Sequence, residues 1–196
     1  MRRIEFSIFM VAFAVIATLL WTACSVNVKK EKNGDDKQVD IQTPVGGIHV
    51  SKDADPADAG LAVYPGAHLK PKDASGDDKS ANVNLSGFGF GLKVVALEYE
   101  SEDPPDKIVA FYNGQLKKYG SVLECHTSGH FDLDVETDDK TDSKSRVLTC
   151  TGEKGNNIEL KVGTRDNQHI VAVEPEGKGS SFSLVYVRTH GRQADI

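Results

Sequence analysis

The chain has 196 residues, with 23 Lys and Arg against 29 Asp and Glu, which gives a formal net charge of −6. Hydrophobic residues make up 39% and charged residues 27%, values that disfavour a fully disordered chain and a polytopic membrane protein. The acidic balance and the lack of a long Lys/Arg run argue against nucleic acid as a partner. The length suits one domain with a tail.

Residues 1–23 have the order of a secretory signal peptide. Two arginines precede an apolar stretch over residues 6–21, and small residues follow it. This order of a basic, an apolar and a small-residue region is typical of export signals. We therefore expect the remainder of the chain to be exported.

Cys24 directly follows this segment. The sequence Leu20-Trp21-Thr22-Ala23-Cys24 resembles the lipobox of bacterial lipoproteins, with Trp21 at a place that is usually aliphatic. The resemblance implies that Cys24 becomes the mature N-terminus and carries a diacylglycerol, with palmitate as a typical acyl chain. Two or three acyl chains suffice for stable membrane attachment, whereas one chain binds only marginally.

The resemblance also bears on localisation. Ser25, next to the acylated cysteine, favours the outer membrane or its periplasmic face in a bacterium with two membranes. One alternative is a single-pass anchor, because residues 6–23 reach the lower limit for crossing a bilayer. Ordinary cleaved secretion is a second alternative. In each case we expect an unidentified envelope protein or ligand as the further partner.

The exported part divides by composition. Residues 24–40 are polar and lack apolar periodicity, so we expect a solvated tether. A single α+β domain is expected over 41–188, followed by a flexible tail over 189–196. Alternation of apolar and polar residues over 41–50 predicts a short hairpin at the edge of this domain.

The clearest predicted element is a helix over about 103–119. Asp103 can cap it, Pro104 and Pro105 suit its first turn, and Gly120 ends it. Short β-branched segments separated by turns predict strands around this helix, at 83–85, 92–99, 122–126, 131–135, 146–150, 158–162, 169–173 and 182–187. We expect a mainly antiparallel sheet of about six to eight strands with the helix packed on one face.

A second resemblance covers roughly residues 57–126. The motifs that carry it are Val63-Tyr64-Pro65-Gly66-Ala67, Asp103-Pro104, Phe111-Tyr112, Leu116, Tyr119-Gly120 and Cys125. Their order is similar to a pattern that recurs in exported bacterial proteins of unknown function. The resemblance implies a fold and an export route, with no activity attached.

Cys125 and Cys150 remain as an even pair once Cys24 is assigned to lipid. Each lies in an apolar segment that is predicted to be a strand, and an oxidising compartment favours a disulfide between them. Two buried thiols or a metal pair are the alternatives, and no CxxC motif supports a metal.

The segment between these cysteines is rich in carboxylates. Asp132, Asp134, Glu136 and Asp138 could hold calcium, although the glycine demanded by an EF-hand loop is absent. A solvated strand and loop is the simpler interpretation of the acidic 132–142 segment. The flanking His126 and His130 are weak metal ligands, because Ser128-Gly129 breaks the helix that would align them.

Other chemical motifs are scarce, and we expect no cofactor. Glycines around Phe88 and Phe90 indicate a turn between strands, where exposed phenylalanines would mark a contact patch. Arg165, Asp166, His169, Ser180 and Ser181 could supply parts of a hydrolytic site, but short polar turns provide such parts in most proteins.

We therefore expect a lipid-anchored, non-enzymatic binding or cell-envelope structural module. A calcium-dependent or hydrolytic exported enzyme that uses the acidic 132–142 loop is the alternative from another class. Cleavage before Cys24 would remove the only tryptophan, Trp21, and with it the usual platform for sugars and quaternary ammonium groups.

Overall fold

The computed structural model describes residues 25–30, 36–71, 79–87, 89–128, 147–151 and 153–191. Its elements in chain order are β1 (Ser25–Lys30), β2 (Asp36–Thr43), β3 (Gly46–Ser51), the 3-10 helix η1 (Pro56–Ala59), β4 (His68–Leu69), β5 (Ser80–Gly87), β6 (Phe90–Ser101), α2 (Pro105–Leu116), the 3-10 helix η2 (Lys117–Tyr119), β7 (Leu123–Thr127), β8 (Asn157–Thr164), β9 (Asn167–Glu176) and β10 (Gly179–His190).

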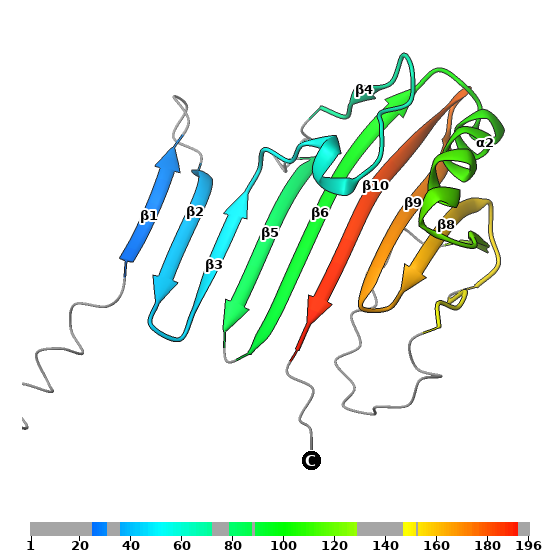
Figure 1. Cartoon of the computed structure of the whole chain (residues 1–196). Coiled ribbons are helices and arrows are strands. Elements are labelled where there is room, and N and C mark those ends of the chain that lie inside the picture. Colours follow the sequence, from blue (N-terminus) through cyan, green and yellow to red (C-terminus); the bar gives the residue numbers. More distant parts are fainter. Residues whose placement is uncertain are drawn as a thin grey trace, which may run out of the picture.

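Within the described residues, ten strands form one antiparallel sheet (Figure 1). Their order across the sheet is β1-β2-β3-β5-β6-β10-β9-β8-β7, and β4 pairs with β6 beside this path. The longest pairing joins β6 to β10, from Ser101↔Ser180 to Gly91↔His190. The predicted α+β class with a mainly antiparallel sheet and one principal helix is confirmed, but the strands outnumber the six to eight expected.

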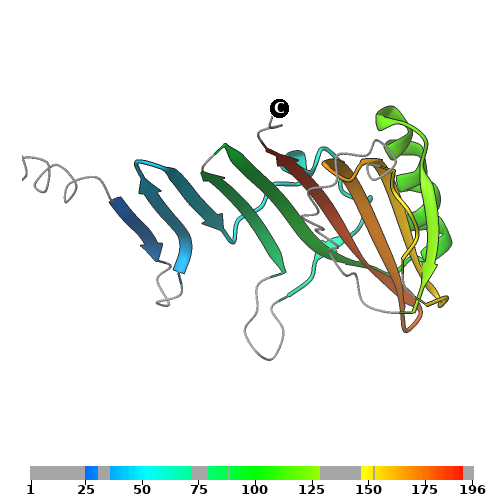
Figure 2. The same ribbon diagram turned by 90° about the horizontal axis from the view of Figure 1, so that it is seen from below.

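The core lies between α2 and one face of this sheet. Ile108, Tyr112 and Leu116 recur every four residues along α2 and are fully buried. They pack with side chains of β8, β9 and β10, namely Leu160, Val162, Val171, Val173, Phe182 and Leu184. Figures 1 and 2 show α2 over this end of the sheet, whereas β1, β2 and β3 extend beyond the helix.

The start of α2 differs slightly from the prediction. Pro104, not Asp103, is the N-cap residue, with φ −68° and ψ 157°. A proline disfavours the helical conformation in the residue before it, so Pro105 keeps Pro104 extended and becomes the first helical residue. Asp103 instead accepts hydrogen bonds from the Tyr64 hydroxyl (2.9 Å) and Lys107 Nζ (2.6 Å).

The structure differs from the expected tether over 24–40. Residues 25–30 form β1 and residues 36–43 form β2, both within the sheet. Val26 and Val28 alternate with polar neighbours, as do Val39 and Ile41. Each alternation spans only a few residues, and the composition of the whole segment is polar. The strand pattern is therefore weak in the sequence. The sheet therefore begins at Ser25, directly after Cys24.

Two further expectations are corrected. β10 continues through Thr189 and His190, which pair with Leu92 and Gly91 of β6, so the tail does not begin at residue 189. Residues 147–150 are not a strand. This segment lies beside β7 through the Cys150 disulfide and makes no ladder with it.

Candidate functional site

The predicted pairing of Cys125 with Cys150 is confirmed. The two residues form a disulfide with their Cα atoms 5.4 Å apart. Cys125 is buried in β7, whereas Cys150 is exposed in an irregular segment. The bond therefore fastens this segment to the edge strand of the sheet, and it does not join two neighbouring strands as expected.

Several predicted site residues lie outside the described residues. They are Cys24, Phe88, His130 and the calcium candidates Asp132, Asp134, Glu136 and Asp138. Of the predicted phenylalanine patch, Phe90 begins β6 and is 43% exposed. The glycine-rich sequence before Phe90 is a turn, because Gly87 of β5 pairs with Phe90 of β6 and Gly89 has a φ of +82°. His126 is exposed on β7, where its Nε2 lies 3.2 Å from Glu124 Oε1.

The histidine and the serines of the possible hydrolytic site do not come together, and Arg165 and Asp166 lie in the turn between β8 and β9. His169 lies opposite Tyr186 of β10, five residues along that strand from Ser181, a distance of about 17 Å in an extended chain. Ser180 donates its hydroxyl to the carbonyl oxygen of Asp103 (2.8 Å), and Ser181 accepts from Lys70 Nζ (3.2 Å). Ser180 and Ser181 therefore make structural contacts at the start of β10, away from His169.

His169 has a structural environment. Its Nδ1–H donates to the carbonyl oxygen of Ala59 (2.9 Å), and its ring stacks on Tyr119 and Tyr186, with centroids 3.8 and 4.7 Å away. Burial lowers the pKa of His169, the charge of Lys118 acts in the same direction, and the bond to Ala59 opposes them. The neutral imidazole thus fastens η1 to the sheet.

An open hollow of about 1000 Å³ lies where β6 ends and β9 turns into β10. Its lining residues are Pro65, Gly66, His68, Glu100, Ser101, Glu102, Asp103, Glu176, Lys178, Gly179 and Ser180. Four carboxylates against one lysine give it an acidic character. Nowhere among the described residues do three His, Cys, Asp or Glu gather closely enough to hold a metal ion.

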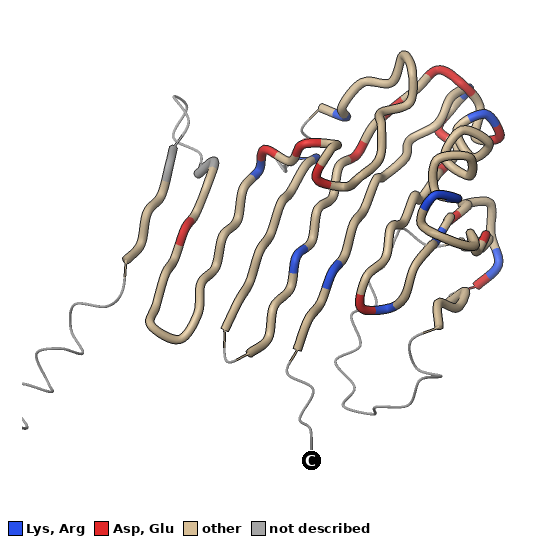
Figure 3. Tube along the Cα trace, viewed as in Figure 1, with Lys and Arg blue, Asp and Glu red and all other residues tan. Residues whose placement is uncertain are grey.

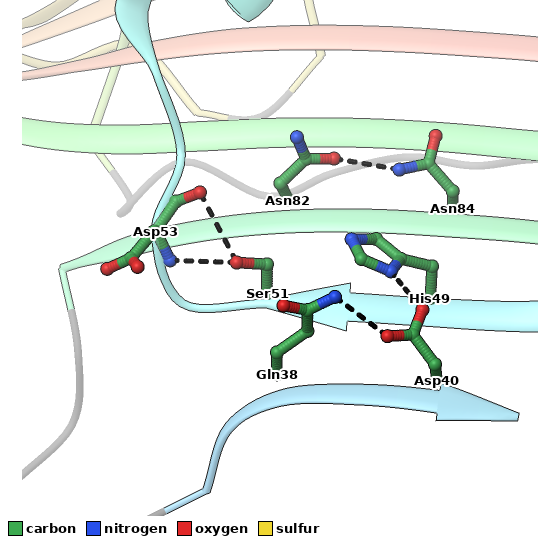
Figure 4. A network of polar contacts seen from close by, with 7 residues as sticks. All are labelled: Gln38, Asp40, His49, Ser51, Asp53, Asn82 and Asn84. Atoms are coloured by element: carbon green, nitrogen blue, oxygen red, sulfur yellow. Dashed lines mark hydrogen bonds and ion pairs between the residues drawn. The ribbon is translucent and has the colours of Figure 1, made fainter. Parts of the chain in front are cut away.

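A network of polar side chains covers the sheet beyond α2. We name it the polar shelf; Figure 4 shows its members, which are Gln38, Asp40, His49, Ser51, Asp53, Asn82 and Asn84. Gln38 Nε2 donates to Asp40 Oδ2 (2.7 Å), and His49 Nδ1 bonds the other carboxylate oxygen. Asn84 donates to Asn82 (2.9 Å). The His49 contact joins β3 to β2, and the strand register places Asn82 and Asn84 of β5 beside Ser51 and His49, so the polar side chains form one continuous surface.

The polar shelf lies on the α2 side of the sheet. Gln38 is opposite Ser51, Ser51 opposite Asn82, and Asn82 opposite Val95, which belongs to the core under α2. Asn82 Nδ2 also donates to Asp58 (3.2 Å), which lies 3.7 Å from Lys93 Nζ. The shelf therefore extends to η1. In the sequence, the shelf is indicated only by the polar residues that alternate with apolar ones in β2, β3 and β5.

The opposite face of the same strands is apolar. We name two rows of side chains that face each other across five strands the apolar ladder, which consists of Val26, Ile41, Ile48, Leu85 and Leu92 in one row and Val28, Val39, Val50, Val83 and Val94 in the other. The second row continues to the buried Val187 of β10. Successive residues of a strand point to opposite faces, so the shelf and the ladder cover the two sides of one layer.

Comparisons with protein-family models, curated proteins and solved structures returned no match. Both resemblances drawn from the sequence therefore stay predictions. In the part of the chain that the structure describes, no helix has the length and apolar character to cross a membrane.

Proposed function

We propose that this protein is exported, anchored to a membrane by lipid on Cys24, and acts as a non-enzymatic binding or envelope-structural module. The observation that carries the binding role is the polar shelf, an ordered and solvent-accessible array of amide, carboxylate and imidazole groups. Such a surface suits a partner that presents hydrogen-bonding groups, because each group of the shelf can donate to or accept from it. In a bacterium with two membranes, the periplasmic side of the outer membrane is the proposed location.

The shelf lies on strands that extend beyond α2 as an open layer, and this shape favours binding over catalysis (Figure 1). Small-molecule sites are usually concave and bury most of the ligand. Here the polar groups project from neighbouring strands of an open layer, where Gln38 donates to Asp40 and Asn84 donates to Asn82. A macromolecular partner that covers the layer can exchange these contacts for its own.

Intact mass of the protein purified from its native membrane tests the anchor. We expect a chain that begins at Cys24 and carries added acyl mass. The Cys24→Ala variant is the control and should lose the acyl mass. A chain that begins at Met1 would overturn lipidation and leave residues 6–23 as a single-pass anchor, while a soluble chain cut elsewhere would indicate ordinary secretion.

Site-specific photocrosslinking in living cells tests the shelf. A photoreactive amino acid at Asn84 should give a discrete adduct, because this side chain is part of the shelf. The same group at Ala110, which is exposed on α2, is the matched control and should not give that adduct. No adduct at position 84, or the same adduct at both positions, would contradict a binding role for the shelf.

A further inference from the structure

The apolar ladder is most exposed at its β1 end. Val26 is 65% exposed, Ile48 42% and Val28 40%, whereas Val187 at the other end of the second row is only 1% exposed. Single exposed apolar side chains are ordinary, but a contiguous row that spans several strands marks a contact surface. The ladder is therefore a candidate contact surface at the end nearest the N-terminus.

Charge is absent from the strands at the centre of the ladder. β3 and β5 contain no Lys, Arg, Asp or Glu. Figure 3 shows charged residues around α2 and η1, and also within β2, β6 and β10. The ladder residues themselves are all apolar, so they can enter an apolar environment without the cost of desolvating an ion.

The position of the ladder in the chain selects its partner. β1 begins at Ser25, so only the peptide bond between residues 24 and 25 separates this strand from Cys24. If Cys24 carries lipid, no linker separates the sheet from the membrane. Val26 is then two residues from the residue that bears the lipid. The most exposed member of the ladder is thus the one closest to the attachment point.

The size of the ladder also favours a membrane over a second copy of the chain. Two rows across five strands cover about 25 by 14 Å, or roughly 350 Å². A stable dimer needs about 800 Å² from each partner. A surface tethered beside the bilayer needs much less, because the anchor keeps its effective concentration high.

We propose that the apolar ladder docks on the boundary between headgroups and acyl chains of the membrane that holds Cys24. This inference rests on the proposed lipid anchor. Docking in this way places β1, β2 and β3 flat on the membrane and directs the polar shelf away from it. The same layer then attaches to the lipid by one face and presents its binding groups on the other.

Tryptophan scanning of the lipidated, full mature protein tests this orientation, because a chain that begins at Cys24 contains no tryptophan. Val28→Trp places the probe on the ladder, and Asn27→Trp places it on the opposite face of the same strand. Both proteins are reconstituted in phosphatidylethanolamine and phosphatidylglycerol vesicles, with and without bromine on the acyl chains. Ile48→Trp repeats the ladder measurement on β3, and matching circular dichroism spectra verify that each variant folds.

We expect blue-shifted emission for Val28→Trp and about threefold stronger bromine quenching than for Asn27→Trp, because a docked apolar face reaches the top of the acyl region. Equal, weak quenching at both positions would overturn the proposal. Blue-shifted emission without bromine quenching, and dependent on protein density, would show that a second copy covers the ladder and would also overturn it.

Intact mass of the same samples separates this test from the anchor itself. A chain that begins at Met1 would refute lipidation but would still carry the ladder. The fluorescence of Trp21 in the unsubstituted protein would then be subtracted, and the difference between positions 28 and 27 would decide the docking.

Discussion

At the scale of single residues, His169 links the 3-10 helix η1 to the sheet. Gly60 follows η1 with a φ of +70°, and a side chain at this position would collide with the Tyr119 hydroxyl. The Gly60 carbonyl oxygen accepts from that hydroxyl (2.6 Å) and from Lys118 Nζ (3.0 Å). Because Gly60 has no side chain, the turn after η1 and the rings of Tyr119 and Tyr186 can pack around the imidazole of His169.

Burial of His169 predicts a pH dependence of stability. Its pKa is lowered in the folded protein, whereas the unfolded chain has the ordinary value of about 6.5. Below that value the unfolded state binds more protons, so stability is full above about pH 6.5 and falls as the pH decreases toward the folded pKa. One proton gives a slope of at most about 1.4 kcal/mol per pH unit.

Urea denaturation between pH 5.5 and 7.5 measures this slope. In His169→Gln the slope should flatten, although the variant is less stable overall because it loses both ring stacks. His126→Gln is a control, since this side chain is exposed on β7. An unchanged slope in His169→Gln would assign the pH dependence to other groups.

At the scale of elements, the helix and the C-terminal strands were predictable because their patterns are strong. The four-residue spacing of Ile108, Tyr112 and Leu116 and the β-branched segments of β8, β9 and β10 each indicate one structure. The hairpin predicted over 41–50 corresponds to the end of β2 and to β3, but β1 and residues 36–40 of β2 were missed because their few apolar residues stand among many charges. Their strand character depends on cross-strand neighbours such as Val50, which only the folded register supplies.

The candidate site was less predictable than the fold. Gln38, Asp40, His49 and Asn84 form no motif, because their positions side by side arise from the register of three strands. The disulfide could be proposed from the number of cysteines. Its place at the β7 edge of the sheet could not be predicted, because residues 147–150 have the composition of a strand but pair with no strand.

The disulfide predicts a stability difference at the β7 edge. Cys125 and Cys150 are 25 residues apart, and closing a loop of this length stabilises the folded state by about 3.5 kcal/mol in the chain-entropy model. The double variant Cys125→Ala/Cys150→Ala should lower the free energy of unfolding by that amount in urea titrations. Reductant should destabilise the unsubstituted protein comparably and leave the variant unaffected. Equal urea midpoints for the oxidised protein and the double variant would show that the disulfide adds no stability.

At the scale of the whole molecule, the two ends of the sheet are built differently. The β6 to β8 end has α2 packed on it and a continuous buried core. The β1 to β3 end has its polar shelf in solvent and exposed ladder residues, and within the described residues β1 pairs on one side only. Local stability follows buried apolar contacts, so the molecule should open from the β1 end first.

Hydrogen exchange by mass spectrometry measures this gradient in the detergent-solubilised protein. Peptides from β1, β2 and β3 should exchange about tenfold faster or more than peptides from β6, β9 and β10, because local opening precedes global unfolding. β7 is the internal control: it is also an edge strand, yet the disulfide fastens it, so reduction should accelerate exchange in β7 and leave β1 unchanged. Equal rates at both ends would mean that the sheet unfolds as one cooperative unit. The β1 to β3 layer would then be stable without the membrane surface.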